Sequence, residues 1–220
     1  MAGIVATSLL IFALPAGFAT AKTFRLVALG DSLSAGYGLA AEDAFPVKLE
    51  RALRARGHQV VVENAGVSGD TASGGLQRLD WVLGDQPPDA VILELGANDA
   101  LRAIDPAVTR KALDAILTKL GQRKLPVLLA GMLAPPNLGA RYGAAFAAIY
   151  KDLALAHKAV FYPFFLDGVA GAPDLLQSDG LHPKAAGVDE IVRRILPFVE
   201  TLLKRARHAA GGSSNRQEQQ

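Results

Sequence analysis

The 220-residue chain contains no cysteine, which excludes thiol nucleophiles, cysteine-ligated zinc sites and disulfide bonds. Because a protein without thiols is indifferent to redox conditions, this absence leaves the cellular compartment open. The sequence also lacks internal repeats, an interdomain linker and repeated long hydrophobic spans. Apolar residues make up 50% of the chain and charged residues 20%, which fits neither a disordered chain nor an integral membrane protein. Length and composition together predict a single globular domain.

A strong excess of charge of either sign is missing as well. The formal net charge is +2 and the sequence pI is about 8.9. Basic residues gather at Arg193-Arg194 and at Lys204–Arg207, where the solvated face of a last helix explains them better than a nucleic-acid site. We therefore expect a small-molecule substrate, no nucleic-acid partner and a monomer.

Residues 1–21 carry no charged side chain and have an apolar centre from about Leu9 to Leu14. The stretch ends in small residues, Ala19-Thr20-Ala21, as at a secretory cleavage site. This pattern predicts a signal peptide over residues 1–21, a mature protein in the periplasm or outside a bacterial cell, and no stable membrane anchor after cleavage. An uncleaved anchor is the alternative, but Pro15 and Gly17 and the shortness of the apolar run disfavour a spanning helix.

Beyond residue 21, short apolar, β-branched runs alternate with longer helical patterns. The runs predict strands at Phe24–Leu29, Gln59–Asn64, Ala90–Leu95, Pro126–Met132 and Ala159–Phe164. The longer patterns predict helices around Phe45–Arg56, Gly74–Leu83, Ala107–Leu120, Tyr142–His157 and Lys184–Lys204. This alternation predicts an α/β domain over residues 22–207, with a mainly parallel sheet of about five strands covered on both faces. A polar tail over residues 208–220 is expected to be disordered.

Polar and glycine residues follow the first three predicted strands. These segments are Gly30-Asp31-Ser32, Ala65-Gly66-Val67-Ser68 and Gly96-Ala97-Asn98-Asp99. Because ligands bind beyond the carboxyl ends of the strands in open α/β sheets, we expect these loops to share one crevice.

Ser32, Asp179 and His182 provide the parts of an activated serine nucleophile. Asp179 and His182 are three residues apart, so the carboxylate can accept from imidazole Nδ1–H and leave Nε2 free to take the proton of Ser32. Taken singly, Asp31 or Ser32 is explained more commonly as a helix cap, and His182 has a capping or core role as its alternative. The combination indicates a hydrolase.

Three groups are candidate donors to a negatively charged reaction intermediate. The Ser32 N–H lies at a helix N-terminus, Gly66 permits close backbone approach, and Asn98 offers a neutral side-chain amide. Gly66 alone is equally explained as a tight-turn residue, and Asn98 alone as a turn former beside Gly96. Together the three donors predict an oxyanion hole.

The nucleophile elbow of α/β-hydrolases is absent. Ser32 has Ser34 where that motif needs glycine, and Ser68 has Asp70 at the same place. The remaining histidines, His58, His157 and His208, fall on predicted helix ends or in the tail, where surface roles are expected.

In this arrangement the chain resembles the GDSL family, also called SGNH hydrolases. Ser32 in Gly-Asp-Ser-Leu, Gly66, Asn98 in Gly-Ala-Asn-Asp and His182 in Asp-Gly-Leu-His-Pro match the four family blocks in order. The resemblance implies a flavodoxin-like, three-layer α/β/α fold, no cofactor and no metal. It also implies that Ser32 is the nucleophile, His182 the general base and then acid, and Asp179 its orienting partner.

Further segments resemble an exported branch of that family with acyl-CoA thioesterase, arylesterase and lysophospholipase activities. They are Gly36-Tyr37-Gly38, Asn64–Thr71, Tyr142-Gly143 through Tyr150, and Pro163-Phe164-Phe165. The resemblance implies an acyl ester or thioester substrate.

We expect the acyl chain to lie between two loops, 101–105 and 134–139, which depart from the family pattern. The expected substrate-binding residues are Leu33, Leu101, Pro135 and Tyr142.

Three alternatives remain open at the level of the sequence. One is deacetylation of a carbohydrate ester by the same chemistry. Another is a metal-dependent phosphoesterase that uses oxygen and nitrogen ligands in the loops, although no Asp-x-His pair and no second histidine near His182 accompany them. Those ligands would be Asp31, Asn98, Asp99, Asp179 and His182. The third is a non-catalytic lipid- or carbohydrate-binding module.

Overall fold

The computed structural model describes residues 22–217 of the chain, with side chains to residue 209. The predicted signal peptide, residues 1–21, lies outside the described residues. Within the described part, no helix is both long and apolar enough to cross a membrane.

A parallel sheet of five strands forms the centre of the domain, in the order β2-β1-β3-β4-β5. The strands are β1 Phe24–Gly30, β2 Val60–Gly66, β3 Ala90–Glu94, β4 Val127–Ala130 and β5 Val160–Tyr162. All five predicted strands are confirmed, and this strand order is the flavodoxin-like one. In the register of the sheet, Gly30 pairs with Gly66 on one side and with Glu94 on the other, so three strands end at one level.

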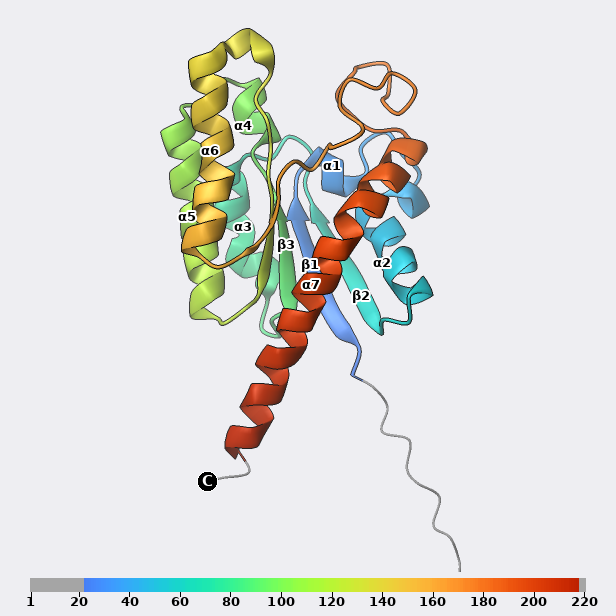
Figure 1. The fold of residues 1–220 in the computed structure, drawn as a ribbon, viewed down its shortest axis with the longest axis vertical. Coiled ribbons are helices and arrows are strands. Elements are labelled where there is room, and N and C mark those ends of the chain that lie inside the picture. Colours follow the sequence, from blue (N-terminus) through green and yellow to red (C-terminus); the bar gives the residue numbers. More distant parts are fainter. Residues whose placement is uncertain (1–21, 218–220) are drawn as a thin grey trace, which may run out of the picture.

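Helices cover both faces of the sheet. They are α1 Ser32–Ala35, α2 Phe45–Ala55, α3 Ala72–Leu83, α4 Ala97–Leu101, α5 Pro106–Gln122, α6 Ala140–Ala156 and α7 Ala185–Gln217, with short 3-10 turns at η1 Ala41–Asp43 and η2 Pro136–Leu138. Figure 1 shows the strands between two groups of helices, with α3, α5 and α6 on one side and α2 and α7 on the other. This confirms the predicted three-layer α/β/α architecture.

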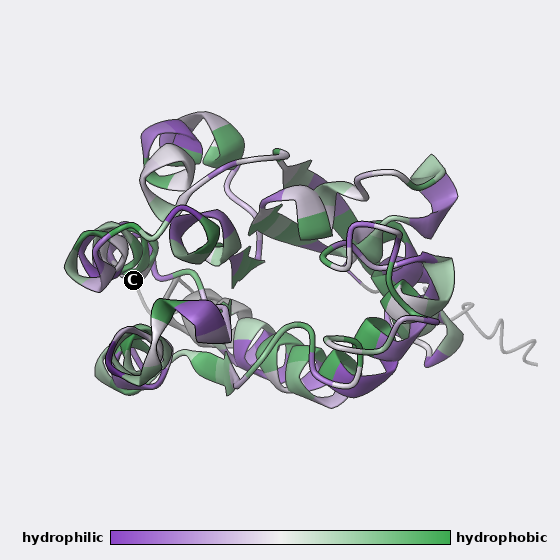
Figure 2. Cartoon of the chain, turned by 90° about the horizontal axis from the view of Figure 1, so that it is seen from above, coloured by the Kyte–Doolittle hydropathy of each residue, from purple (hydrophilic) through white to green (hydrophobic). Residues whose placement is uncertain are grey.

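Burial and capping explain why these segments adopt their structures. Every residue of β3 is buried, as expected for a strand covered by helices on both faces. Seen from above, the strands are hydrophobic, whereas the helices carry both hydrophobic and hydrophilic residues (Figure 2). The start of α3 is fixed by Thr71, whose side chain accepts from Gly74 N–H, and that of α5 by Asp105, which caps the helix before Pro106.

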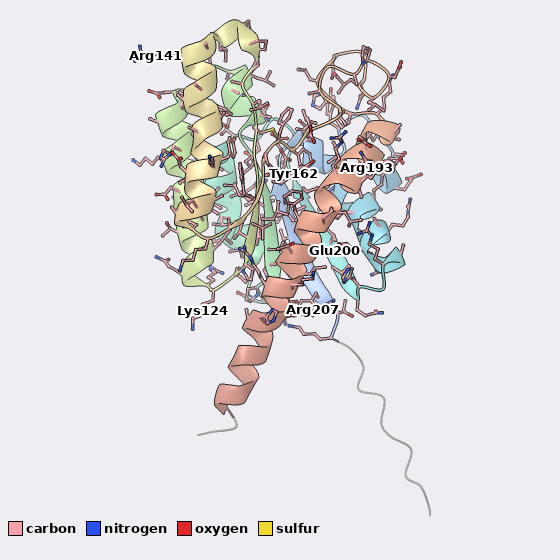
Figure 3. All side chains as sticks on the ribbon, in the orientation of Figure 1. Lys124, Arg141, Tyr162, Arg193, Glu200 and Arg207 are labelled. Atoms are coloured by element: carbon pink, nitrogen blue, oxygen red, sulfur yellow. The ribbon has the colours of Figure 1, made fainter. Side chains whose placement is uncertain are left out.

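The last helix is longer than the sequence predicts. Buried side chains recur every three or four residues of α7 from Val188 to Ala206, which fixes its packing. Glu200, labelled on α7 in Figure 3, accepts hydrogen bonds from Arg56 and contacts His58, and so ties α7 to the end of α2.

Residues 208–220 were expected to form a disordered polar tail, whereas α7 continues to Gln217. No proline follows the buried part of the helix, and each residue added to an existing helix gains a backbone hydrogen bond without a new nucleation cost. Residues 218–220 lie outside the described residues.

The sequence analysis missed the short helix α4. It spans Ala97–Leu101 and lies within a segment expected to be a loop. Five residues are too few to show a helical period, so no pattern in the sequence marks this turn.

We predict that Gly131→Ala destabilises the protein. A Cβ at Gly131, just beyond β4, would lie 2.2 Å from the backbone oxygen of Pro163, which cannot rotate away as a side chain would. We expect the free energy of unfolding, measured by urea titration, to fall by about 1–3 kcal/mol. Gly121→Ala in α5 is the control, because nothing lies within 4 Å of its Cβ position and alanine favours the helix. Equal stability of wild type and Gly131→Ala would show that the two strand ends are farther apart than described.

Candidate active site

Functional side chains collect at the carboxyl edge of the sheet. Ser32 follows β1, Gly66 ends β2, and Asn98 lies in α4 after β3. Asp179 and His182 lie on the long connection between β5 and α7, drawn in orange at the upper end of the molecule in Figure 1. The structure therefore brings all five predicted residues to the same edge.

The hydroxyl of Ser32 and the ring of His182 are in direct contact across 150 residues of sequence. Ser32 Oγ lies 2.9 Å from His182 Nε2, and His182 Nδ1 lies 2.6 Å from Asp179 Oδ2. Both distances are those of hydrogen bonds. The three side chains form a continuous hydroxyl–imidazole–carboxylate line.

Asp179 is held as a carboxylate by its own turn. Its Oδ1 accepts from the backbone N–H groups of Leu181 and His182, while its Oδ2 faces the imidazole. The backbone hydrogen bond from His182 and the side-chain bond to its ring lower the pKa of Asp179 to about 2. Asp179 therefore stays charged at all pH values near neutrality and can fix the tautomer of His182.

Two residues that the sequence analysis did not identify as functional position the His182 segment. Gln177 N–H donates to the carbonyl of His182 at 2.8 Å, and Gln177 Nε2 donates to the carbonyls of Tyr37 and Pro183. The Tyr37 ring packs on the imidazole with 4.5 Å between centroids. No sequence pattern marks Gln177, because its bond to Tyr37 spans 140 residues and its bonds to the nearby His182 and Pro183 follow no helical or strand period.

Asp31 joins the nucleophile turn to Asn98. Its Oδ1 accepts from Leu33 N–H at 3.0 Å and so caps α1, as the capping interpretation expected. Its Oδ2 accepts from Asn98 Nδ2 at 3.2 Å. Capping by Asp31 therefore coexists with the contact between Ser32 and His182 rather than replacing it.

Two of the three candidate oxyanion donors, Gly66 and Asn98, have protein acceptors in this structure. Asn98 Nδ2 also donates to the Asp70 carbonyl at 2.9 Å, and Gly66 N–H donates to Asn64 Oδ1 at 3.0 Å. A Cβ at Gly66 would lie 2.3 Å from the backbone nitrogen of Ala35, so α1 can pack over the end of β2 only because this residue is glycine. Gly66 is thus required by packing as well as being a candidate donor.

An apolar cavity of about 440 Å³ opens beside Ser32 and His182. Asn98 and three of the predicted substrate-binding residues, Leu33, Leu101 and Pro135, line it. Ala134 and Pro136, in the loop 134–139 that was expected to flank the acyl chain, also line it. The rest of the wall comes from residues not predicted for this role, including Met132, Leu133, Phe164, Leu166, Ala170, Leu176 and Leu181.

Tyr142, the fourth residue predicted to bind substrate, does not line this cavity. Its hydroxyl donates to the carbonyl of Ile104 at 2.6 Å and its ring stacks on Phe146. Tyr142 therefore holds the segment between α4 and α5 in place through its hydrogen bond to Ile104. Gly66 does not line the cavity either, and its place is beneath α1.

A second carboxyl group, Glu94, is fully buried under the nucleophile turn. Glu94 Oε2 accepts from Ser34 Oγ at 2.7 Å and from Asp31 N–H at 3.4 Å, and among the described residues Oε1 has no hydrogen-bond partner. Burial raises the pKa of Glu94 well above 4.5 and, to a smaller extent, that of Asp31 to about 6. Asp31 accepts two N–H groups, so we expect the pair to keep its single negative charge on Asp31 and its proton on Glu94. The sequence analysis missed Glu94, although a lone acidic residue ending an apolar strand is a signal that could have marked it.

Metal ligation is not favoured by the arrangement of these groups. Among the described residues, no three histidine, aspartate or glutamate side chains converge on a point where they could hold a metal ion. Asp99, one candidate ligand, is buried and accepts from Ala72 N–H and from Thr109 Oγ1, both at 2.9 Å.

We predict that Glu94→Gln becomes increasingly stabilising as the pH rises. In the unfolded chain Glu94 releases its proton above a pKa of 4.5, whereas in the folded protein burial raises this pKa and the proton is kept. The free energy of unfolding of the wild type therefore falls as the pH rises from 4.5 toward the pKa of folded Glu94. Glutamine does not titrate. Denaturation at about pH 5 and at about pH 8 should therefore show a difference in unfolding free energy that favours the variant and grows with pH.

The exposed residue Glu42 provides the control for this measurement. Glu42→Gln should track the wild type at both pH values. A constant difference between wild type and Glu94→Gln would mean that Glu94 is ionised in the folded protein.

Comparison with known proteins identifies the family. The model of the GDSL-like lipase/acylhydrolase family matches residues 28–189. Esterase TesA of Pseudomonas aeruginosa is 38% identical over 178 residues, covering 81% of this chain and 89% of that protein. Thioesterase 1/protease 1/lysophospholipase L1 of Escherichia coli K12 is 40% identical over 196 residues, covering 84% of this chain and 93% of that protein. The crystal structure of AlinE4, an SGNH-hydrolase family esterase, superposes with a TM-score of 0.71 at 48% identity, covering 84% of this chain and 99% of AlinE4. The chain therefore belongs to the GDSL-like lipase/acylhydrolase family, and it is a carboxylic ester hydrolase.

Proposed function

We propose that the protein hydrolyses fatty-acyl and aryl esters and thioesters through an acyl-serine intermediate formed on Ser32. One observation carries this proposal: the line from Ser32 Oγ through His182 to Asp179, with contacts of 2.9 Å and 2.6 Å, lies at an apolar cavity. Nucleophile, base and orienting carboxylate are thus in contact, as an activated serine requires.

In the first half-reaction Ser32 Oγ attacks the acyl carbon while His182 Nε2 takes the hydroxyl proton. The imidazolium, stabilised by Asp179, then donates that proton to the leaving alcohol or thiol as its bond to the acyl carbon breaks. In the second half-reaction His182 takes a proton from water, which attacks the acyl-serine and releases the carboxylic acid. Ser32 recovers its proton from His182, so the enzyme is regenerated.

The negative charge that develops on the carbonyl oxygen needs donors that are already in place. The N-terminus of α1, the Gly66 N–H and Asn98 Nδ2 are the groups proposed for this task. An oxyanion is a stronger acceptor than the Asn64 amide oxygen or the Asp70 carbonyl that these donors contact now. We propose that it replaces them during the reaction.

The cavity supports an acyl substrate rather than a charged or sugar ester. Its wall consists mainly of leucine, methionine, phenylalanine, alanine and proline side chains. Such a surface binds a hydrocarbon chain by excluding water from both. Lysophospholipids share this acyl chain, and the name of the Escherichia coli relative includes lysophospholipase. We propose lysophospholipids as a further substrate class.

We propose that the enzyme is exported to the periplasm or beyond after removal of residues 1–21. The apolar centre of that stretch and its small-residue end support this proposal. Mass spectrometry of the exported protein would support it by showing Lys22 as the first residue.

A panel of substrates tests the proposed substrate class. We expect hydrolysis of p-nitrophenyl octanoate and of a fatty-acyl thioester at higher kcat/KM than p-nitrophenyl acetate, because the longer chain fills the cavity. An acetylated sugar should react poorly. Preference for the acetylated sugar would replace the proposal by carbohydrate deacetylation.

We predict that a fluorophosphonate probe labels Ser32 in the wild type and fails to label Ser32→Ala or His182→Ala. Ester hydrolysis should survive a metal chelator and disappear in Ser32→Ala. Loss of activity on chelation would support the metal-dependent alternative, and a wild type without labelling or turnover would support a binding module.

We predict that Asn98→Ala lowers kcat by about 10²–10³ with little change in KM, as removal of one oxyanion donor does. Steady-state kinetics with p-nitrophenyl esters measure the two constants separately. A change confined to KM would show that Asn98 binds the substrate elsewhere.

A further inference from the structure

Arg78 on α3 reaches three separate segments of the candidate site with one guanidinium group. Nη2 donates to the carbonyl of Gly30 at 2.9 Å, Nη1 to the carbonyl of Ala65 at 2.8 Å, and Nε to Asp70 Oδ2 at 2.7 Å. The side chain is 17% exposed, and that of Asp70 13% exposed. All three nitrogen atoms of the guanidinium are therefore engaged inside the protein.

Each of these partners is either close in sequence to one of the three proposed oxyanion donors or hydrogen-bonded to it. Gly30 is two residues before Ser32, and Ala65 directly precedes Gly66. Asp70 accepts from Asn98 Nδ2 through its own carbonyl at 2.9 Å. The Arg78 side chain thus contacts the backbone close to Ser32 and Gly66. It also contacts Asp70, whose carbonyl accepts from Asn98.

The planar shape of the guanidinium matters for this arrangement. The carbonyls of Gly30 and Ala65 lie near the carboxyl ends of neighbouring strands, and that of Gly30 also accepts from Val67 N–H at 3.1 Å. A rigid fork of N–H groups can serve two neighbouring strand ends and a carboxylate at fixed spacing, whereas a lysine ammonium is a point charge on a flexible stem. The register that pairs Gly30 with Gly66 places the two carbonyl-bearing segments side by side for this fork.

We infer that Arg78, paired with Asp70, is a positioning residue that sets the spacing of the three oxyanion donors. This inference rests on the proposed function. Arg78 does not line the apolar cavity and touches no reacting atom, so it acts only through Gly30, Ala65 and Asp70. Its loss would loosen all three donors at once.

Looser donors weaken binding of the transition state more than binding of the substrate. The negative charge on the carbonyl oxygen exists only in the transition state and the tetrahedral intermediate, and stabilisation by fixed donors depends on their being held in place beforehand. We therefore expect Arg78→Lys to lower kcat by about tenfold to a hundredfold with KM nearly unchanged. The charge is kept in this variant, so the loss reports the geometry of the fork.

Arg123→Lys is the matched control. Arg123 Nη2 donates to Asp80 Oδ1 on α3 at 2.9 Å, so it pairs with a carboxylate on the same helix as Arg78, but the residue is exposed and does not line the cavity. Its kcat should stay within about twofold of the wild type. Thermal unfolding of each variant establishes that the protein is folded under the assay conditions.

The inhibition constant of an alkyl boronic acid distinguishes a positioning role of Arg78 from a purely structural one. The boronic acid forms a tetrahedral, negatively charged adduct with a serine nucleophile and so needs the oxyanion donors, whereas a neutral substrate needs them little in the ground state. For Arg78→Lys and Arg78→Ala, the inhibition constant should rise by the same factor as kcat/KM falls. Methylguanidinium added to Arg78→Ala should restore part of kcat by filling the site of the missing side chain.

Two outcomes would overturn the inference. The first is an equal kcat for Arg78→Lys and the wild type, when each kcat is calculated per molecule that the fluorophosphonate probe can label. The second is a loss of activity in Arg78→Ala that follows the unfolded fraction alone, with an unchanged boronic acid constant. Failure of the proposed function is distinguishable, because the wild type itself would then show neither labelling of Ser32 nor ester hydrolysis.

Discussion

The parallel register of β1 with β2 and β3 is the constraint on which the site depends. Because Gly30 pairs with both Gly66 and Glu94, three strands stop at one level, and the segments that follow them must turn within a small volume. Ser32, Asn98 and the Gly66 backbone meet there. The connection from β5 then brings His182 over the same edge, where its Nε2 reaches the Ser32 hydroxyl.

Around that edge, polar groups hold one another in place instead of facing water. Asp31 caps α1 and accepts a hydrogen bond from Asn98. Glu94 accepts one from Ser34, and Arg78 on α3 donates to the carbonyl at the end of β1. Buried polar groups are costly unless they are hydrogen-bonded, so a network of this kind restricts the turn to one geometry. Ser32, the proposed nucleophile, thus has rigid support on one side and an open apolar cavity on the other.

The sequence analysis succeeded where a local pattern carried the information. Apolar runs such as Ala90–Leu95 predicted all five strands because a strand buried on both faces is apolar at almost every position. Where a partner lay far away in the chain, no local pattern was available. Tyr142 was expected at the substrate wall, and in the structure its hydroxyl donates to the carbonyl of Ile104, 38 residues away. The length of α7 also differs from the expectation, because the helix continues to Gln217.

By itself the sequence determined the fold class and predicted the chemistry of the site. The alternation of strands and helices specified a covered parallel sheet, and the motifs around Ser32, Gly66, Asn98 and His182 predicted a serine hydrolase. Only the tertiary structure decided which other residues serve that chemistry. Glu94, Gln177 and Arg78 gained their partners when distant segments met at the sheet edge, because hydrogen bonds across 60, 140 and 48 residues leave no periodic or local trace in a sequence.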